Sequence, residues 1–171
     1  MFVGVDANAD GLRDVSRRAA AKPSRGGVPN ALFGRLALEA LPGELEGFAD
    51  SVTLLLPWGS LLGAVARPEV DALARIRGLC KADAQLRVVF GYDVESDARA
   101  IETLALCALD AREFCTQLEL GYRAAGFDVR VAPIVTDRVR ALRTTWSQKL
   151  AFSGRSRQFI EVLGRCGAEV V

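Results

Sequence analysis

The sequence contains no histidine among its 171 residues. Histidine is the commonest general base near neutral pH, so its absence excludes Ser-His-Asp and Cys-His catalysis. The chain has four cysteines, none of them in a C-x-x-C pair, and aromatic residues make up only 7% of it. Dispersed thiols without histidine argue against a zinc site and fit reduced cysteines in a cytoplasmic protein. Any reaction at this protein must therefore proceed without imidazole, and we expect no metal.

The chain also lacks a signal sequence, a long apolar span, internal repeats and low-complexity segments. These absences favour a protein that does not act in a membrane. A composition of 50% hydrophobic and 25% charged residues predicts one globular domain over residues 1–171 with a full-sized core. The net charge of +1 excludes a uniformly basic nucleic-acid-binding chain, although a local patch can still be basic.

Short apolar segments alternate with helical patterns along the chain, which predicts an α/β fold with parallel β-α-β units. The expected strands are 2–5, 30–38, 51–56, 85–90, 127–131 and 159–163. The expected helices are 8–21, 60–79 with a break at Pro68, two between 96 and 125, and 136–152. The strand at 51–56 is the most apolar, so we expect it to be buried on both faces of a parallel sheet.

This apolar run ends abruptly in Pro-Trp-Gly-Ser at 57–60. Such an ending places Trp58 at the mouth of the sheet, where open α/β folds bind ligands. The second tryptophan, Trp146, also stands beside hydroxyl residues such as Thr144. Two indoles can hold a flipped purine between their faces. The alternative is that both are ordinary half-buried aromatics.

Two acidic residues follow predicted strands at positions suited to a nucleotide. A carboxylate at Asp6 could accept hydrogen bonds from both ribose hydroxyls, or it could cap the next helix. Glu39 could accept from a ligand amine or cap a short helix. The usual companion of such an acid is a glycine-rich loop after an earlier strand. The strand before Asp6 begins at the first residue, and the Gly26-Gly27 loop follows a helix.

Two segments are basic in an otherwise nearly neutral chain. Residues 13–25 contain five basic residues and one acidic residue, and residues 137–157 contain six basic residues and one acidic residue. Together they indicate a face suited to phosphate groups. Each segment alone is equally explained by a solvated helix face.

Several motifs in combination resemble one known family, the aminoglycoside-resistance 16S ribosomal RNA methyltransferases that modify N1 of adenine 1408. The motifs are Val5-Asp6, Lys22-Pro23-Ser24-Arg25-Gly26-Gly27, Glu39-Ala40-Leu41-Pro42, Pro57-Trp58-Gly59-Ser60 and Trp146-x-x-x-Leu-Ala-Phe. The resemblance implies a class I methyltransferase with a Rossmann-like sheet that uses S-adenosyl-L-methionine.

The resemblance also implies roles for individual residues. Asp6 matches the acid on the cofactor ribose, Glu39 lies beside the cofactor adenine, and Pro57 lines the pocket. Residues implied at the target adenine are Trp58 and Trp146, which stack on it, with Ser60 and Thr144 nearby. Residues implied in docking on the 16S rRNA of the 30S subunit are Lys22, Arg25, Lys149, Arg155 and Arg157.

Two departures from the family pattern bear on activity. Arg35 and Leu38 interrupt a strand expected to hold small apolar residues near the cofactor adenine. The larger departure is the first strand and helix, which in this family lie before Asp6 and supply the glycine turn. The sheet is therefore expected to be incomplete at its N-terminus, and we favour an upstream unit ahead of Met1. An inactive relative that binds RNA, or an unrelated α/β nucleotide-binding domain, are the alternatives.

Overall fold

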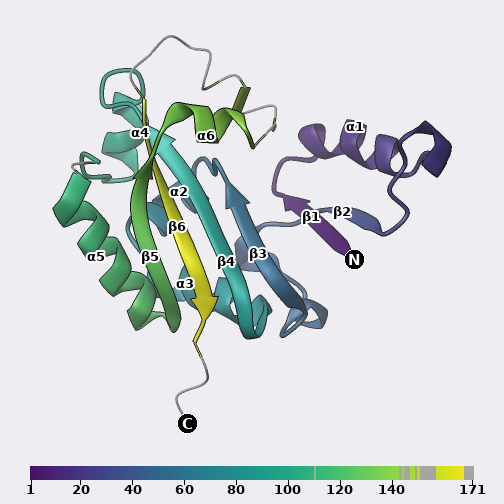
Figure 1. Cartoon of the computed structure of the whole chain (residues 1–171), viewed down its shortest axis with the longest axis horizontal. Helices are drawn as coiled ribbons and strands as arrows, with labels where there is room; N and C mark the ends of the chain where they lie inside the picture. The colour runs from purple at the N-terminus through teal and green to yellow at the C-terminus, as the bar shows by residue number, and fades with distance from the viewer. Residues whose placement is uncertain (110, 143, 145–146, 149, 151–156, 168–171) are drawn as a thin grey trace. The chain divides into compact units, whose positions relative to one another are not determined.

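The computed structural model describes residues 1–109, 111–142, 144, 147–148, 150 and 157–167. The chain divides into two compact units, Met1–Gly43 and Glu44–Val171 (Figure 1). The expectation of a single domain over the whole chain stays a prediction.

The N-terminal unit is a strand, a helix and a second strand. β1 (Phe2–Asp6) pairs in parallel with β2 (Ala31–Arg35), and α1 (Ala9–Ala19) connects them. The Asn8 side chain begins α1 by accepting a hydrogen bond from the Asp10 amide at 3.0 Å, which satisfies a backbone donor of the first turn. Three short 3-10 turns, at Pro23–Arg25, Leu38–Ala40 and Gly43–Leu45, complete the elements up to the second unit.

The second unit is built on a four-stranded sheet in the order β3-β4-β6-β5. These strands are β3 (Ala49–Leu55), β4 (Cys80–Tyr92), β5 (Phe127–Ile134) and β6 (Gln158–Cys166). β3 and β4 are parallel, but β6 runs antiparallel to both β4 and β5. The expectation of purely parallel pairing is therefore wrong for β6. The two sheets share no ladder among the described residues.

Helices cover one face of this sheet, and a short helix lies over one end of the other face (Figure 1). The helices on the first face include α2 (Ser60–Ala66), α3 (Val70–Leu79) and α5 (Ala111–Ala124). The short helix on the other face is α6 (Thr136–Arg140), and α4 (Ala98–Thr103) follows β4 in the chain. The main core forms where buried Leu86, Val88 and Phe90 of β4 face the covering helices. Tyr122 of α5 is fully buried there, and its hydroxyl donates to the Val65 carbonyl at 3.2 Å.

Most of the predicted elements are present, with three differences. The helix break at Pro68 and the two helices between 96 and 125 are confirmed. β2 is shorter and β4 longer than expected. β3 is not buried on both faces, because it lies at the edge of its sheet and no described helix covers exposed Ser51 and Thr53. Of the helix expected at 136–152, the described helical residues are those of α6 and three later ones, Ser147, Gln148 and Leu150.

No helix in the described part of the chain is long and apolar enough to cross a membrane. Among the same residues, no group of three acidic or cysteine side chains is arranged to hold a metal ion.

Candidate target and cofactor sites

The turn after β3 presents a tryptophan to solvent. The Trp58 side chain is 53% exposed, Pro57 before it is half-buried, and exposed Ser60 begins α2. Gly59 precedes the helix with φ 61° and ψ −140°, a conformation that side chains with a Cβ rarely adopt. Glycine at this position therefore allows the chain to reverse directly after the indole. The structure thus places Trp58 on the surface at the carboxyl end of a parallel strand, where the sequence predicted it.

Leu56, between the strand and this turn, has an unusual backbone. Its φ is 53°, which is a left-handed conformation that branched apolar residues seldom adopt. Its side chain is nonetheless 8% exposed, and its amide donates to the Val89 carbonyl at 2.7 Å. The chain therefore leaves the sheet in a constrained turn whose first residue is held by both backbone and side chain.

Leu56 belongs to an apolar cluster on the face of the sheet that carries α6. The cluster consists of buried Leu56, Val89, Val139 and Phe159, with Leu55, Ile134, Leu142 and Leu150 packed against it. We call this set the α6 cluster. Since its members come from β3, β4, β5, β6, α6 and the residues after α6, it ties the end of β3 to the segment that follows α6.

Thr144 and Ser147 form a reciprocal cap after α6. The Ser147 amide donates to Thr144 Oγ1 and the Thr144 amide donates to Ser147 Oγ, both at 2.9 Å. Ser147 is fully buried, and the Gln148 amide donates to the Thr144 carbonyl at 3.1 Å, as in a first helical turn. The Thr144 hydroxyl therefore has a structural partner. The predicted site residues Trp146, Lys149 and Arg155 lie outside the described residues.

In the N-terminal unit, the two acidic candidates follow paired strands at one edge of their sheet. Asp6 ends β1, and Glu39 lies four residues after the end of β2; both side chains are exposed. One Asp6 carboxylate oxygen accepts from the Asn8 amide at 2.8 Å, and the other has no hydrogen bond within the described residues. Asp6 does not cap α1, because Asn8 does. An exposed, half-satisfied carboxylate at this position fits a ribose diol.

Arg35, which departs from the family pattern, is hydrogen-bonded to the backbone of the neighbouring turn. Its Nε donates to the Ala7 carbonyl at 3.2 Å, across the turn between β1 and α1. The guanidinium is therefore occupied by the backbone of that turn. Leu38 is half-buried in the 3-10 turn that carries Glu39.

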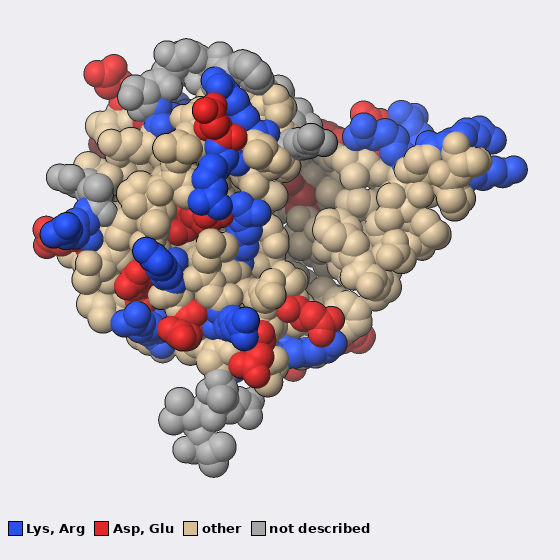
Figure 2. Space-filling model, viewed as in Figure 1, with Lys and Arg blue, Asp and Glu red and all other residues tan. Residues whose placement is uncertain are grey.

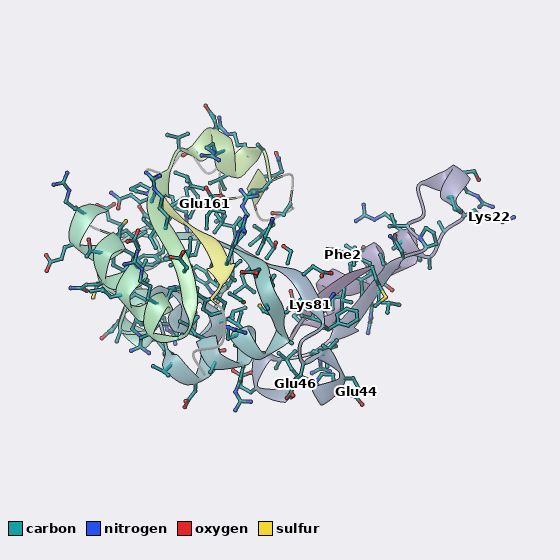
Figure 3. The ribbon with its side chains drawn as sticks, turned by 60° about the horizontal axis from the view of Figure 1, so that its bottom comes forward. Phe2, Lys22, Glu44, Glu46, Lys81 and Glu161 are labelled. Carbon is teal, nitrogen blue, oxygen red and sulfur yellow. The ribbon has the colours of Figure 1, made fainter. Side chains whose placement is uncertain are left out.

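The basic candidates differ in what their side chains contact. Lys22 and Arg25 are exposed in and beside the turn after α1, and three exposed arginines, Arg13, Arg17 and Arg18, lie on α1 itself (Figures 2 and 3). These two residues are available to phosphate groups.

Arg157 departs from the expectation of an RNA-facing arginine. Its side chain is only 6% exposed, and its Nη1 lies 2.7 Å from Oδ2 of Asp97, while Nη2 donates to Oδ1 at 3.2 Å. Nη1 also donates to the Gly91 carbonyl at 3.3 Å. A guanidinium already paired inside the protein is not presented to a phosphate, so Arg157 fastens the start of β6 to the loop after β4.

A second ion pair lies on the sheet face that carries α6. Glu161 of β6 is 4% exposed, and its Oε1 accepts from Nε and Nη2 of Arg87 at 2.9 and 2.7 Å (Figure 3). Arg138 of α6 lies 3.8 Å from Oε2 of the same carboxylate. Glu161 thus links α6 to the sheet. Neither Glu161 nor Asp97 was singled out from the sequence, because neither the single acid between Ile160 and Val162 nor the acidic run at 93–97 carries a local signal of a distant partner.

Tyr92 is the last residue of β4, and the pKa of its hydroxyl is shifted. Burial, and secondarily the neighbouring Cys107 thiol, raise the pKa of Tyr92 above its ordinary value. Its hydroxyl donates to the Cys107 carbonyl at 2.5 Å. Tyr92 is therefore a neutral structural donor rather than a proton acceptor at neutral pH.

Comparison with known proteins places this geometry first in a class and then in a family. The fold is that of a class I methyltransferase: the chain is similar to the crystal structure of the aminoglycoside resistance methyltransferase NpmB1, with a TM-score of 0.74, 39% identity, and coverage of 95% of this chain and 74% of that one. It is also similar to a tryptophan-to-alanine mutant of the 16S rRNA (adenine(1408)-N(1))-methyltransferase from Catenulisporales acidiphilia, solved with cosubstrate SAM. That match has a TM-score of 0.82, 27% identity, and coverage of 99% and 76%.

The family model described as NpmA, 16S rRNA (adenine(1408)-N(1))-methyltransferase, matches residues 1–165. A 16S rRNA (adenine(1408)-N(1))-methyltransferase of Escherichia coli is 33% identical over 165 residues, which are 95% of this chain and 75% of that protein. The chain belongs to the 16S rRNA (adenine(1408)-N(1))-methyltransferase family, and the predicted resemblance is confirmed. It spans about three quarters of the length of these relatives.

Proposed function

We propose that this protein transfers a methyl group from S-adenosyl-L-methionine to N1 of adenine 1408 in the 16S rRNA of the 30S subunit. This methylation would make the ribosomes of the cytoplasm resistant to aminoglycosides. The observation that carries it is the family match over residues 1–165, combined with an exposed Trp58 at the carboxyl end of β3. N1-methylation removes a hydrogen-bond acceptor and adds a positive charge to the base, which alters a drug site built around that base.

The reaction suits a protein without histidine. Bound S-adenosylmethionine supplies an electrophilic methyl group, and adenine N1 carries a lone pair at neutral pH, so no general base is needed. The residues of this chain then have one main task, which is to hold the base in line and exclude water. We assign the stacking faces to Trp58 and Trp146, with Pro57 and Ser60 forming the wall beside Trp58 and Thr144 fixing the turn that precedes Trp146.

The cofactor would be held by the N-terminal unit. Exposed Asp6 has a carboxylate oxygen free for the ribose hydroxyls among the described contacts, and exposed Glu39 lies beyond the end of the neighbouring strand. A carboxylate that accepts from both hydroxyls orients the sugar and hence the rest of the nucleoside.

Docking on the ribosome would use the exposed cations. Lys22 and Arg25 supply charge beside α1, and Lys149 and Arg155 remain predicted contacts in the second basic segment. Each phosphate contact releases counterions, so the affinity for 30S subunits should fall with salt. Arg157 is left out of this set because its charge is paired with Asp97.

The direct test incubates the purified full-length protein, as its gene encodes it, with Escherichia coli 30S subunits and radiolabelled S-adenosylmethionine. We expect label in 16S rRNA and a reverse-transcription stop at adenine 1408, together with growth of expressing cells on kanamycin and apramycin. A folded chain that binds 30S subunits but transfers no label would contradict the proposal and favour the RNA-binding relative. A folded chain that neither binds nor methylates 30S subunits would also contradict the proposal.

A further inference from the structure

Leu56 combines a left-handed backbone conformation with a buried side chain. Its φ of 53° costs a bulky residue free energy, because Cβ approaches the following carbonyl oxygen. Its side chain is nevertheless buried in the α6 cluster, at 8% exposure. A strained backbone persists only where the surrounding structure holds it, and such residues are enriched at functional sites.

The contacts around Leu56 show what holds it. The amide donates to the Val89 carbonyl at 2.7 Å, one step beyond the last paired residues Leu55 and Val89. The side chain packs in the same cluster as fully buried Val139 of α6 and nearly buried Phe159 of β6. The backbone is thus fixed on one side by the sheet and the side chain on the other by α6.

The position of this residue gives the constraint a consequence. Leu56 precedes Pro57, whose φ is fixed by its ring, and Trp58 follows immediately. The direction in which the chain leaves Leu56 therefore sets where the half-exposed indole stands. A relaxed Leu56 would let the turn swing without unfolding the sheet.

We propose that Leu56 is a positioning residue for the target base: the α6 cluster holds it in the left-handed conformation that aims Trp58. This inference rests on the proposed function, since it assumes that Trp58 stacks on the adenine. It assigns a role in methyl transfer to apolar residues that touch neither the base nor the cofactor.

The first test observes Trp58 alone and needs no activity. The chain has two tryptophans, so a Trp146→Phe background leaves Trp58 as the only indole fluorophore. In this background, Leu56→Ala and the milder Val139→Ala should raise acrylamide quenching and lower the fluorescence anisotropy of Trp58. Leu73→Ala is the matched control, because Leu73 is fully buried in α3 and lies outside the α6 cluster. It should destabilise the protein but leave both signals unchanged.

A second measurement tests the backbone constraint itself. Glycine is ordinarily less stable than alanine, because it loses more entropy on folding. At a left-handed position the order reverses, so Leu56→Gly should melt at or above the temperature of Leu56→Ala. A clearly lower melting temperature for Leu56→Gly would overturn the claim that the native conformation at residue 56 is constrained.

The kinetic test uses the chain with both tryptophans. Leu56→Ala and Val139→Ala should reduce kcat for 30S methylation by about ten- to a hundred-fold, the scale of a small misplacement of reacting groups, with little change in KM. Unchanged Trp58 quenching in folded Leu56→Ala and Val139→Ala would overturn the proposal. If the unsubstituted chain transfers no methyl group while the quenching differences appear, the proposed function fails and the positioning of Trp58 stands.

Discussion

Replacing Trp58 by alanine should remove one stacking face from the target site while leaving the fold intact. Tryptophan offers roughly 150–250 Å² for burial, so at 53% exposure about 100 Å² of the side chain remains free to cover a base. At about 25 cal/mol per Å², this area corresponds to about 2.5 kcal/mol. The value lies within the ~1–3 kcal/mol measured for stacking of one base on one aromatic side chain.

The expected kinetic effect follows from this free energy. A loss of about 2.5 kcal/mol lowers kcat/KM by about seventy-fold, because each 1.36 kcal/mol corresponds to roughly a factor of ten. The assay is the initial rate of label transfer to 30S subunits at subsaturating subunit concentration. Trp58→Phe keeps a smaller aromatic face, so its kcat/KM should lie between those of Trp58→Ala and the unsubstituted protein. Affinity for S-adenosylmethionine should not change, since the predicted cofactor residues Asp6 and Glu39 are untouched.

A matched control is available at the other end of the same strand. Phe48 is 40% exposed and immediately precedes β3, whereas Trp58 follows it. Phe48→Ala removes a comparable exposed aromatic group and should leave the methylation rate unchanged. The reasoning is refuted if Trp58→Ala methylates at the unsubstituted rate, or if Phe48→Ala loses as much activity as Trp58→Ala.

Two further predictions concern stability and thiol chemistry. Arg87→Met should cost about 2–3 kcal/mol in urea unfolding, below the ~3–5 kcal/mol for breaking a fully buried pair. The reason is that it removes both hydrogen bonds from Arg87 to the buried Glu161 Oε1 and leaves Arg138 at 3.8 Å from Oε2, while Arg87 itself is 37% exposed. Lys81→Met, which breaks a surface pair, should barely move the urea midpoint, and equal losses would contradict the difference in burial. With Ellman's reagent, exposed Cys107 should react fast and the three buried cysteines only after unfolding. The pKa of the Cys80 thiol is raised to about 12, mainly by burial, so mildly alkaline pH should not create its reactive thiolate. Rapid labelling of Cys80 in the folded chain would refute this expectation.

The elements that local patterns define were predictable, and their pairing was not. Asn8 before an amphipathic run predicts where α1 begins, and Pro68 predicts the break between α2 and α3; both are confirmed. Strand direction depends on where a connection returns, which hydrophobic period does not encode, so antiparallel β6 was missed. The burial of 51–56 was overestimated for a related reason: apolar sequence records the tendency to be buried, while neighbours decide the outcome.

The candidate site divides in the same way. Proline, tryptophan and glycine in one run predict an exposed aromatic in a turn, and Trp58 is exposed. Counting arginines, by contrast, does not distinguish side chains that form ion pairs from those that do not. Arg157 was therefore predicted to contact RNA, although it forms an ion pair with Asp97, which is distant in sequence. The left-handed Leu56 gave no signal at all, because leucine is the ordinary residue of an apolar strand and only its backbone is unusual.

The α6 cluster bears on the proposal that two tryptophans far apart in the sequence serve one base. Leu56 stands two residues before Trp58, and Leu142 and Leu150 stand four residues before and after Trp146; all three leucines pack in this cluster. Both tryptophan-bearing segments are therefore attached to the same apolar side chains. Because packed interiors respond to the loss of even one methylene, a change here should be felt at both segments. Under the proposed function, the geometry at the target base would then depend on residues that touch neither the base nor the cofactor.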